Sequence, residues 1–198
     1  MFTGIIHHIG KVIKARYLED ELMLEIQCAL FKDGQIGASF AINGVCLTQV
    51  KCIGQIATFN VVVETLQKTN LRFLEKGDNV HVEESLSLLG KVEGHFVQGH
   101  VDGIAKIIEN TPTKLVVEVS EELEQYLIPK GSIAIDGTSL TIAQLADNTV
   151  EVALIPHTYE NTLFREKKED DFVNIEIDMF AKTIFKYLDK LGLKGAGL

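Results

Sequence analysis

The sequence predicts an all-β protein made of two tandem copies of one small closed β-barrel, followed by a single C-terminal α-helix. Three observations support this prediction. The chain contains an internal repeat, both copies are rich in short β-branched segments bounded by turn residues, and a helical spacing of apolar residues follows the second copy. Its 198 residues also suit two domains, because independent domains of about 90–100 residues are common.

The internal repeat is clearest in the middle of each copy. Residues 37–50, GASFAINGVCLTQV, align with residues 130–143, KGSIAIDGTSLTIA, and the register continues without a gap to residues 83 and 176. The opening strand also repeats, since TGIIHHIGKV at 3–12 aligns with QGHVDGIAKI at 98–107. Paired Gly, Ser and Thr residues in one register indicate a duplicated module rather than a shared β-strand composition. Identical pairs include Ser39/Ser132, Ala41/Ala134, Ile42/Ile135, Gly44/Gly137, Leu47/Leu140, Thr48/Thr141, Thr65/Thr158, Thr69/Thr162, Asp78/Asp171, Val80/Val173 and Glu83/Glu176.

Each copy is predicted to consist of short strands bounded by Gly, Asp or Asn. Asn43-Gly44 and Asp136-Gly137 favour tight turns, because these residues tolerate a positive φ. A small number of short strands can close into a small barrel, and this closure removes the exposed strand edges. The predicted strands are Ile5–Ile13, Leu22–Cys28, Ser39–Ile42, Ala57–Val63 and Asn79–Glu83 in the first copy, and Gly99–Ile108, Lys114–Val119, Ser132–Ile135, Val150–Ile155 and Val173–Ile177 in the second.

Two helical segments are predicted in the second half of the chain. Ser120–Leu127 begins with a capping serine and two glutamates. The C-terminal helix starts at Asp178 as its N-cap and carries an apolar stripe that has no counterpart after the first copy. This stripe packs either on its own barrel or against another subunit, and the sequence leaves both alternatives open. The apolar stripe of the helix consists of Phe180, Ile184, Phe185, Leu188 and Leu191. The expected domains are residues 1–94 and 95–178, followed by the helix at 179–198.

Composition and charge exclude several classes of function. A net charge of −9 without a Lys/Arg run argues against nucleic-acid binding. No apolar stretch approaches the roughly 20 residues of a membrane helix, and the N-terminal segment lacks the features of a signal peptide, so we expect a cytoplasmic location. Cys28, Cys46 and Cys52 form no CxxC pair, so neither a disulfide framework nor a zinc knuckle is indicated. Dinucleotide and ATP motifs are missing as well.

Polar residues occur at matched positions of the two copies, which predicts two chemically similar ligands. Two differences, Cys46 against Ser139 and Glu64 against His157, suggest that one copy binds its ligand while the other also activates it. Cys46 also fits the alternative role of a small buried hydrophobe, and His95 and His100 lack further ligands at a spacing that would hold a metal. The matched sets are Ser39, Cys46, Thr48, Asn60, Glu64 and Thr65, and Ser132, Ser139, Thr141, Ala153, His157 and Thr158.

A set of motifs along the chain resembles the riboflavin synthase α-chain family over essentially the full length. The resemblance implies two six-stranded closed barrels of Greek-key type, and a C-terminal helix through which three chains associate. The motifs are the MFTGI start, NGVCLT at 43–48, VETLQKTNL at 63–71, GHFVQGHVDG at 94–103, IDGTSLT at 135–141, LIPHTYENT at 154–162 and VNIEID at 173–178.

The resemblance implies a reaction that uses two molecules of one substrate. In that family, two molecules of 6,7-dimethyl-8-ribityllumazine exchange a four-carbon unit to give riboflavin and 5-amino-6-(D-ribitylamino)uracil, with no metal or organic cofactor. A duplicated module suits this dismutation, because aligning two bound reactants supplies roughly 7–11 kcal/mol. The resemblance places each active site between the first copy of one subunit and the second copy of its neighbour. Its implied partners are the two lumazines, further copies of the chain as a homotrimer, and lumazine synthase as a candidate protein partner.

The resemblance also assigns site residues. His100 is the expected base for the C7 methyl proton, because an imidazole titrates near neutral pH. Cys46 is expected to add to the other lumazine or to assist water addition, with Ser39, Ser139, Thr141 and Asp178 completing the catalytic set. The first copy is expected to bind its lumazine through Gly4, Ile5, Ile6, Cys46, Leu47, Thr48, Asn60, Val61, Val62, Val63, Glu64 and Thr65. The second copy is expected to use Gly99, His100, Val101, Lys130, Ser139, Leu140, Thr141, Ala153, Leu154, Ile155, Pro156, His157 and Thr158.

Two alternative functions belong to other classes of protein. Related proteins keep the duplicated fold but bind lumazine or flavin only as a chromophore, and they have no need for Ser39, Cys46 and His100 together. A carrier with hydroxyl-lined pockets explains the repeat but not the particular motifs. Two positions depart from the commonest family pattern: Val45 stands where some members have Cys, and Asn60 where some have Asp. Asn60 therefore puts in doubt any role that needs a carboxylate there.

Overall fold

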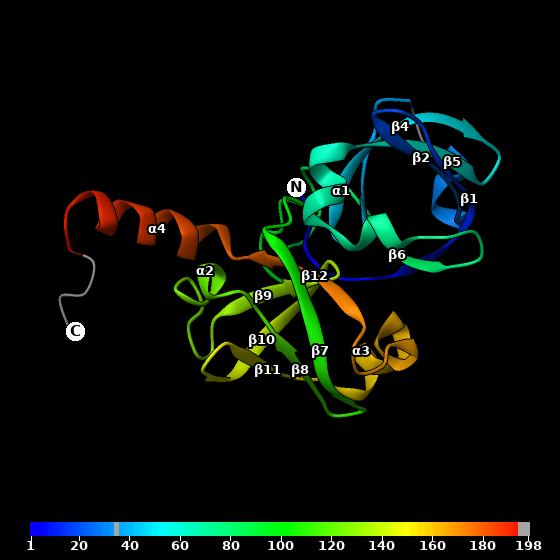
Figure 1. The fold of residues 1–198 in the computed structure, drawn as a ribbon. Coiled ribbons are helices and arrows are strands. Elements are labelled where there is room, and N and C mark those ends of the chain that lie inside the picture. Colours follow the sequence, from blue (N-terminus) through cyan, green and yellow to red (C-terminus); the bar gives the residue numbers. More distant parts are fainter. Residues whose placement is uncertain (34–35, 194–198) are drawn as a thin grey trace.

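The computed structural model describes residues 1–33 and 36–193, which form two closed antiparallel barrels and a projecting helix (Figure 1). The predicted fold class is therefore confirmed. The first barrel contains β1 (His8–Tyr17), β2 (Glu21–Gln27), β3 (Ser39–Ile42), β4 (Val45–Ile53), β5 (Ile56–Val62) and β6 (Asn79–Glu84), in the spatial order β1-β2-β5-β4-β3-β6. The second contains β7 (Gly103–Thr111), β8 (Lys114–Glu118), β9 (Ser132–Ile135), β10 (Thr138–Ala146), β11 (Thr149–Ala153) and β12 (Phe172–Ile177), in the equivalent order β7-β8-β11-β10-β9-β12.

Each barrel encloses its own apolar core. The strands alternate between inward and outward residues, so β2, with the sequence ELMLEIQ, buries Leu22, Leu24 and Ile26 completely. Burying a side chain of this size stabilises a fold by about 1.5–3 kcal/mol. Aromatic rings fill the centre of the first barrel, where Phe31 and Phe40 meet edge to face with centroids 5.0 Å apart. Two separate cores explain why the repeat unit is one barrel.

The observed strands differ from the predicted ones mainly at the start of each copy. β3 and β9 have the predicted bounds, but β4 and β10 were not among the predicted strands. β1 starts at His8 rather than Ile5, and β7 starts at Gly103 rather than Gly99, so both predicted starts were wrong. The reason is that both segments contact the other barrel before the strand begins. Gly4 and Gly99 have left-handed φ angles of 75° and 78°, and their carbonyl oxygens accept from Ser139 N and Cys46 N.

The residues before β1 and β7 meet each other between the barrels. Phe2 and Val97 form an isolated antiparallel bridge, in which Phe2 N donates to Val97 O at 2.7 Å and Val97 N donates to Phe2 O at 3.1 Å. Both side chains are buried, together with Ala41 and Ala134 from the two barrels. Phe2 and Val97 occupy equivalent places in the repeat, so their reciprocal bonds mark an approximate two-fold axis that relates the two copies. The residues before β1, 2–7, and those before β7, 97–102, are called the leading segments below. Because each leading segment contacts the other half of the chain, the division after residue 94 stays a prediction.

A buried polar network also joins the barrels around this axis. His81 Nδ1 lies 2.8 Å from the carbonyl oxygen of Asp136, and the backbone N–H of Leu163 donates to His81 Nε2 at 2.8 Å. At the position related by the repeat, Asn174 Nδ2 donates to the carbonyl oxygen of Asn43 at 2.8 Å. Since Nε2 accepts a hydrogen bond, the imidazole is neutral and carries its proton on Nδ1. Burial lowers the pKa of His81, which keeps the ring in this form.

Short helices connect the strands, and the longest helix ends the described chain. In each barrel a helix and a 3-10 turn fill the connection before the last strand. These helices are α1 (Val63–Lys68), η2 (Asn70–Phe73), α3 (Pro156–Asn161) and η3 (Leu163–Glu166), accompanied by η1 (Ala29–Asp33), α2 (Glu121–Glu124) and the terminal α4 (Met179–Lys190). The predicted helix Ser120–Leu127 is thus shorter than expected. Within the described residues, none of the helices has the length and apolar character needed to cross a membrane.

Helix α4 begins where the sequence predicts and packs on its own barrel along one side only. Asp178 is its N-cap, accepting a hydrogen bond from Phe180 N at 2.8 Å. Ala181 packs on the second core, and the ring of Phe185 meets that of Tyr126 with centroids 4.9 Å apart. The opposite side is apolar but exposed, and Figure 1 shows α4 extending away from both barrels. The exposed apolar residues are Ile184, Tyr187, Leu188 and Leu191, with exposed fractions of 40–66%.

Candidate functional site

A cavity of about 300 Å³, which we call pocket one, lies on the outside of the first barrel. The start of β4 supplies one wall with Cys46, α1 supplies a second with Glu64 and Thr65, and a segment that precedes β7 supplies a third with His100. The cavity therefore combines elements from both halves of the chain. Its lining residues are Val45, Cys46, Glu64, Thr65, Lys68, Thr69, Gly99, His100 and Val101.

Backbone hydrogen bonds place His100 beside Cys46. The backbone N–H of Cys46 donates to the carbonyl oxygen of Gly99 at 2.9 Å. A methyl group on Gly99 would lie 2.6 Å from Cβ of Cys46, so only glycine permits this approach. The carboxylate of Glu176 accepts from Gln98 N at 2.6 Å and from Gly99 N at 2.9 Å, which holds the segment from its other side. The pKa of Glu176 is raised, because the effect of burial outweighs the opposing effect of the two backbone N–H donors.

The repeat generates an equivalent arrangement of backbone contacts on the second barrel, and we call the surface around these contacts pocket two. The backbone N–H of Ser139 donates to the carbonyl oxygen of Gly4 at 2.7 Å, and a methyl group on Gly4 would lie 2.7 Å from Cβ of Ser139. The carboxylate of Glu83 accepts from Thr3 N at 2.7 Å and from Gly4 N at 3.1 Å. Burial raises the pKa of Glu83 as it does for Glu176. The residues equivalent to the lining of pocket one are Thr138, Ser139, His157, Thr158, Asn161, Thr162, Gly4, Ile5 and Ile6.

The two leading segments are therefore exchanged between the barrels. The sequence grouped Gly4 to Ile6 with Cys46 and Gly99 to Val101 with Ser139, whereas the structure brings together Gly99 with Cys46 and Gly4 with Ser139. The expected pairing followed chain order, because a strand was predicted to start within its own barrel. The exchange depends on the left-handed glycines and on the Phe2–Val97 bridge. Neither feature has a signature in the period of the apolar residues.

Comparison with known proteins identifies the family. A family model described as "Lumazine binding domain" matches residues 3–85 and 98–178, one match for each copy. Riboflavin synthase from Bacillus subtilis (strain 168) is 40% identical over 195 residues, covering 96% of this chain and 91% of that protein. The chain belongs to the riboflavin synthase family. Riboflavin synthase from Brucella abortus (strain 2308) is 39% identical over 192 residues and covers 92% of this chain and 95% of that protein.

Solved structures confirm the fold of this family member. LumP complexed with 6,7-dimethyl-8-(1'-D-ribityl) lumazine superposes with a TM-score of 0.80 at 21% identity, covering 89% of this chain and 99% of that chain. LumP complexed with riboflavin superposes with a TM-score of 0.82 at 22% identity and the same coverage. At these identities the superpositions support the two-barrel architecture alone. The two lumazine-binding domains of the family are the two barrels described above.

The two pockets differ in the side chains that surround them. Pocket one contains the half-buried thiol of Cys46 and the exposed imidazole of His100. The equivalent residues of pocket two are Ser139 and Ile5. Pocket one also carries an ion pair on α1, where Lys68 Nζ lies 3.2 Å from Glu64 Oε1, and pocket two has His157 and Asn161 at those positions. The two pockets therefore share their backbone hydrogen bonds but differ in their side chains. This combination fits two similar ligands that take different parts in a reaction.

Two of the other predicted residues, Ser39 and Thr141, lie on strands β3 and β10. Ser39 pairs with Thr48 across β3 and β4, and Thr141 occupies the equivalent place opposite Ser132 in the second barrel. Five predicted ligand residues are buried, with exposed fractions of 8% or less. These residues are Leu47, Val61, Leu140 and Leu154, together with Ile6, which lies in the leading segment.

Lys130 stands out among the predicted site residues because of its backbone. Its φ angle is 67°, a conformation that costs a non-glycine residue about 1–2 kcal/mol. The repeat places Gly37 at the equivalent position, with a φ angle of 90°. The turn therefore suits glycine, and the second copy carries a lysine in spite of the strain. Such a residue is expected to be kept for its side chain.

His95 was missed as a site residue by the sequence analysis. Its Nδ1 lies 2.7 Å from the hydroxyl oxygen of Ser139, and burial lowers the pKa of the imidazole. The sequence considered His95 only as an ordinary histidine or as a metal ligand. In the part of the chain that the structure describes, His, Cys, Asp and Glu side chains form no group of three suited to a metal ion. The motif GHFVQGH already contained the signal, because it places His95 near the exchanged segment.

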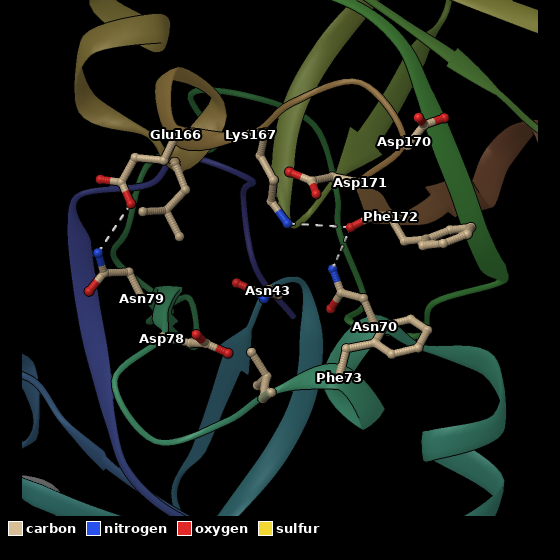
Figure 2. Close-up of a pocket in the computed structure, with 12 residues that line it drawn as sticks. Asn43, Asn70, Phe73, Asp78, Asn79, Glu166, Lys167, Asp170, Asp171 and Phe172 are labelled. Atoms are coloured by element: carbon tan, nitrogen blue, oxygen red, sulfur yellow. Dashed lines mark hydrogen bonds between the residues drawn. The ribbon is translucent and has the colours of Figure 1, made fainter.

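A separate cavity of about 370 Å³ lies between the two barrels and contains none of the predicted site residues (Figure 2). Asn70 Nδ2 and Lys167 Nζ both donate to the carbonyl oxygen of Phe172, at 3.3 Å each. Asn79 Nδ2 donates to Glu166 Oε2 at 3.1 Å across the cavity. The bonds from Asn70 to Phe172 and from Asn79 to Glu166 connect the two halves of the chain, so this cavity belongs to the interface between the barrels.

Proposed function

We propose that the chain is a riboflavin synthase, which converts two molecules of 6,7-dimethyl-8-ribityllumazine into riboflavin and 5-amino-6-(D-ribitylamino)uracil. The observation that carries this proposal is the pair of equivalent pockets with unequal side chains. The pockets share their backbone hydrogen bonds, which suits two copies of one substrate. Pocket one alone combines a thiol, Cys46, with an imidazole, His100. Family membership supports the same reaction.

His100 is proposed as the base that removes the C7 methyl proton of one lumazine. An exposed imidazole on the cavity wall is free to accept a proton and to return it, which suits general-base catalysis. The negative charge that results is delocalised into the heterocycle. Cys46 is proposed to add to the electrophilic carbon of the other lumazine or to assist water there. Ser39, Ser139 and Thr141 are proposed as hydrogen-bonding groups, and Asp178 acts at least as the cap of α4.

The two reacting lumazines are proposed to meet between subunits of a homotrimer. Pocket one of one copy would face pocket two of the next, which is a head-to-tail contact that closes into a ring. The exposed apolar side of α4 supports association through this helix. Exposed Val62 and Val63 beside pocket one, and exposed Ile155 beside pocket two, would be covered by the same contact. Association with lumazine synthase and a cytoplasmic location stay predictions.

A chromophore protein that binds lumazine without turnover is the second candidate function. The superposition with LumP favours it as far as the fold is concerned. The presence of Cys46, His100 and Ser39 in one chain favours catalysis, because binding alone requires neither a base nor a thiol. The two functions differ in whether bound lumazine persists.

A turnover assay tests the proposal. Purified protein mixed with dimethylribityllumazine alone should yield riboflavin and the diaminopyrimidine in equal amounts, and a chelator should not change the rate. Lumazine that binds but persists unchanged would support the chromophore function. His100→Ala should slow turnover far more than it weakens lumazine binding, whereas Asp20→Ala, in the exposed turn between β1 and β2, should change neither. Lost affinity with unchanged turnover would assign His100 to binding alone.

A further inference from the structure

The segment that carries His100 is held by more contacts than its counterpart in the other half of the chain. Both segments are clamped by a buried carboxylate, Glu176 for residues 98–99 and Glu83 for residues 3–4. Two residues beyond His100, however, Asp102 forms additional bonds. The aligned residue in the first copy is His7, an exposed side chain. The extra bonds therefore act on pocket one and not on pocket two.

Asp102 links the His100 segment to the start of helix α4. The backbone N–H of Asp102 donates to Ile175 O at 2.8 Å, and Ile177 N donates to Asp102 Oδ2 at 2.9 Å. Lys182, in the first turn of α4, donates to both carboxylate oxygens of Asp102, at 3.0 Å to Oδ1 and 2.9 Å to Oδ2. The side chain of Asp102 is 21% exposed and that of Lys182 is 18% exposed, so the ion pair is largely shielded from solvent. Pairs in such surroundings hold their geometry better than fully exposed ones.

The position of Lys182 on α4 separates this contact from the exposed apolar side of the helix. Lys182 faces its own chain, whereas Ile184, Leu188 and Leu191 are exposed. Helix α4 therefore touches the His100 segment on one side and offers an apolar surface on the other. Lys186, one turn further along α4, forms no ion pair with any described residue and provides a matched control.

We infer that Asp102 and Lys182 are positioning residues, whose ion pair sets His100 in pocket one by fixing its segment to helix α4. The backbone bond from Cys46 N to Gly99 O fixes the segment before His100, and the Asp102–Lys182 pair fixes it after His100. Loss of the pair frees one side of this segment. Neither residue lines pocket one, so the expected defect is in the chemical step rather than in substrate binding. This inference rests on the proposed riboflavin synthase activity.

The test compares Lys182→Met and Asp102→Asn with Lys186→Met in the full chain. Both test variants should lower kcat for riboflavin formation at least ten-fold, with less than a three-fold change in lumazine affinity and no change in sedimentation. Asp102→Asn retains an acceptor for Ile177 N, so it keeps the chain folded if Lys182→Met does not. Lys182→Arg should restore most of the activity, and Lys186→Met should behave as wild type.

Two results would overturn the inference. One is a kcat within two-fold of wild type in folded Lys182→Met and Asp102→Asn. The other is a loss of activity that follows dissociation of subunits alone, which would make the ion pair an assembly contact. A readout independent of turnover is the alkylation rate of Cys46 in a Cys52→Ser background, which should rise in both variants as the segment over Cys46 loosens. If wild-type protein formed no riboflavin, the proposed function would fail, and this rate would still test the positioning role.

Discussion

The exchange of leading segments predicts that two equivalent glycine substitutions damage opposite pockets. Gly99→Ala should impair pocket one and Gly4→Ala should impair pocket two, although each glycine belongs to the other half of the chain. Both positions have a positive φ angle, of 78° and 75° respectively. Each glycine also touches the backbone of the residue it serves, since an added Cβ would lie 2.8 Å from the backbone nitrogen of Cys46 or of Ser139. The two variants are therefore matched in geometry and differ only in the pocket affected.

The expected size of the effect follows from three contributions. A left-handed alanine costs about 1–2 kcal/mol, and forcing a methyl group into a packed contact costs about 1–3 kcal/mol. A lost backbone hydrogen bond adds about 0.5–1.5 kcal/mol. The chain relieves the strain most easily by moving the leading segment away from the barrel, because the two are joined there by few bonds. Since about 1.4 kcal/mol corresponds to a ten-fold change, lumazine affinity should fall at least ten-fold at the affected pocket only.

The assay must distinguish the pockets, and Cys46 makes this measurable. Cys28 is buried, and burial raises the pKa of its thiol, so in a Cys52→Ser background Cys46 is the reactive thiol. Bound lumazine should protect Cys46 from alkylation in wild type and in Gly4→Ala, and protection should be lost in Gly99→Ala. Both variants should lose riboflavin formation, because dismutation needs both pockets. Protection lost in Gly4→Ala but kept in Gly99→Ala would refute the exchanged arrangement.

Three further predictions concern the pH dependence of stability, the association of subunits and the role of Lys130. Burial holds the folded-state pKa of His81 below its unfolded value of about 6.5, so the unfolded chain binds more protons and the free energy of unfolding should fall as the pH drops below about 6.5. Urea titrations at several pH values measure this dependence. If the slope of unfolding free energy against pH were the same in His81→Asn, the prediction would be contradicted. Ile184→Asp combined with Leu188→Asp should yield monomers with intact barrels that bind lumazine but form no riboflavin, and sedimentation of an unchanged assembly would count against α4 as the association helix. Lys130→Gly should match or exceed wild-type stability, because it removes a strained φ angle, yet weaken riboflavin formation; unchanged turnover would show that the lysine side chain has no role there.

The sequence predicted the fold well because the repeat and the strand pattern are local signals. β3 and β9 were predicted to the residue, and Asp178 was identified as the cap of α4. Identities such as Glu83/Glu176 were visible in the alignment, but their meaning was not. A pair of matched glutamates predicts equivalent surroundings, and only the structure shows each carboxylate clamping two backbone N–H groups.

The grouping of site residues was the part that the sequence could not predict. Gly99 and Cys46 are distant in the chain and lie in different copies, so no periodic pattern joins them. Their contact results from one backbone hydrogen bond, Cys46 N to Gly99 O, and a positive φ angle at Gly99, which leave no side-chain signature. His95 was likewise overlooked, because its partner Ser139 belongs to a strand far along the sequence. Contacts between segments that are exchanged across a two-fold axis require coordinates.

The exchange also explains how two copies of one barrel can differ in chemistry without losing their fit. The bonds that join each pocket to its borrowed segment are made by backbone atoms, Cys46 N to Gly99 O and Ser139 N to Gly4 O. A change from thiol to hydroxyl, or from imidazole to the aliphatic Ile5, leaves these bonds intact. Side chains at the pockets are thus free to diverge, while the glycines and the clamping glutamates are not. Substitutions within a pocket should therefore alter turnover at little cost in stability. A substitution at a clamping glutamate should instead lower stability and weaken lumazine binding at the pocket whose segment that glutamate holds.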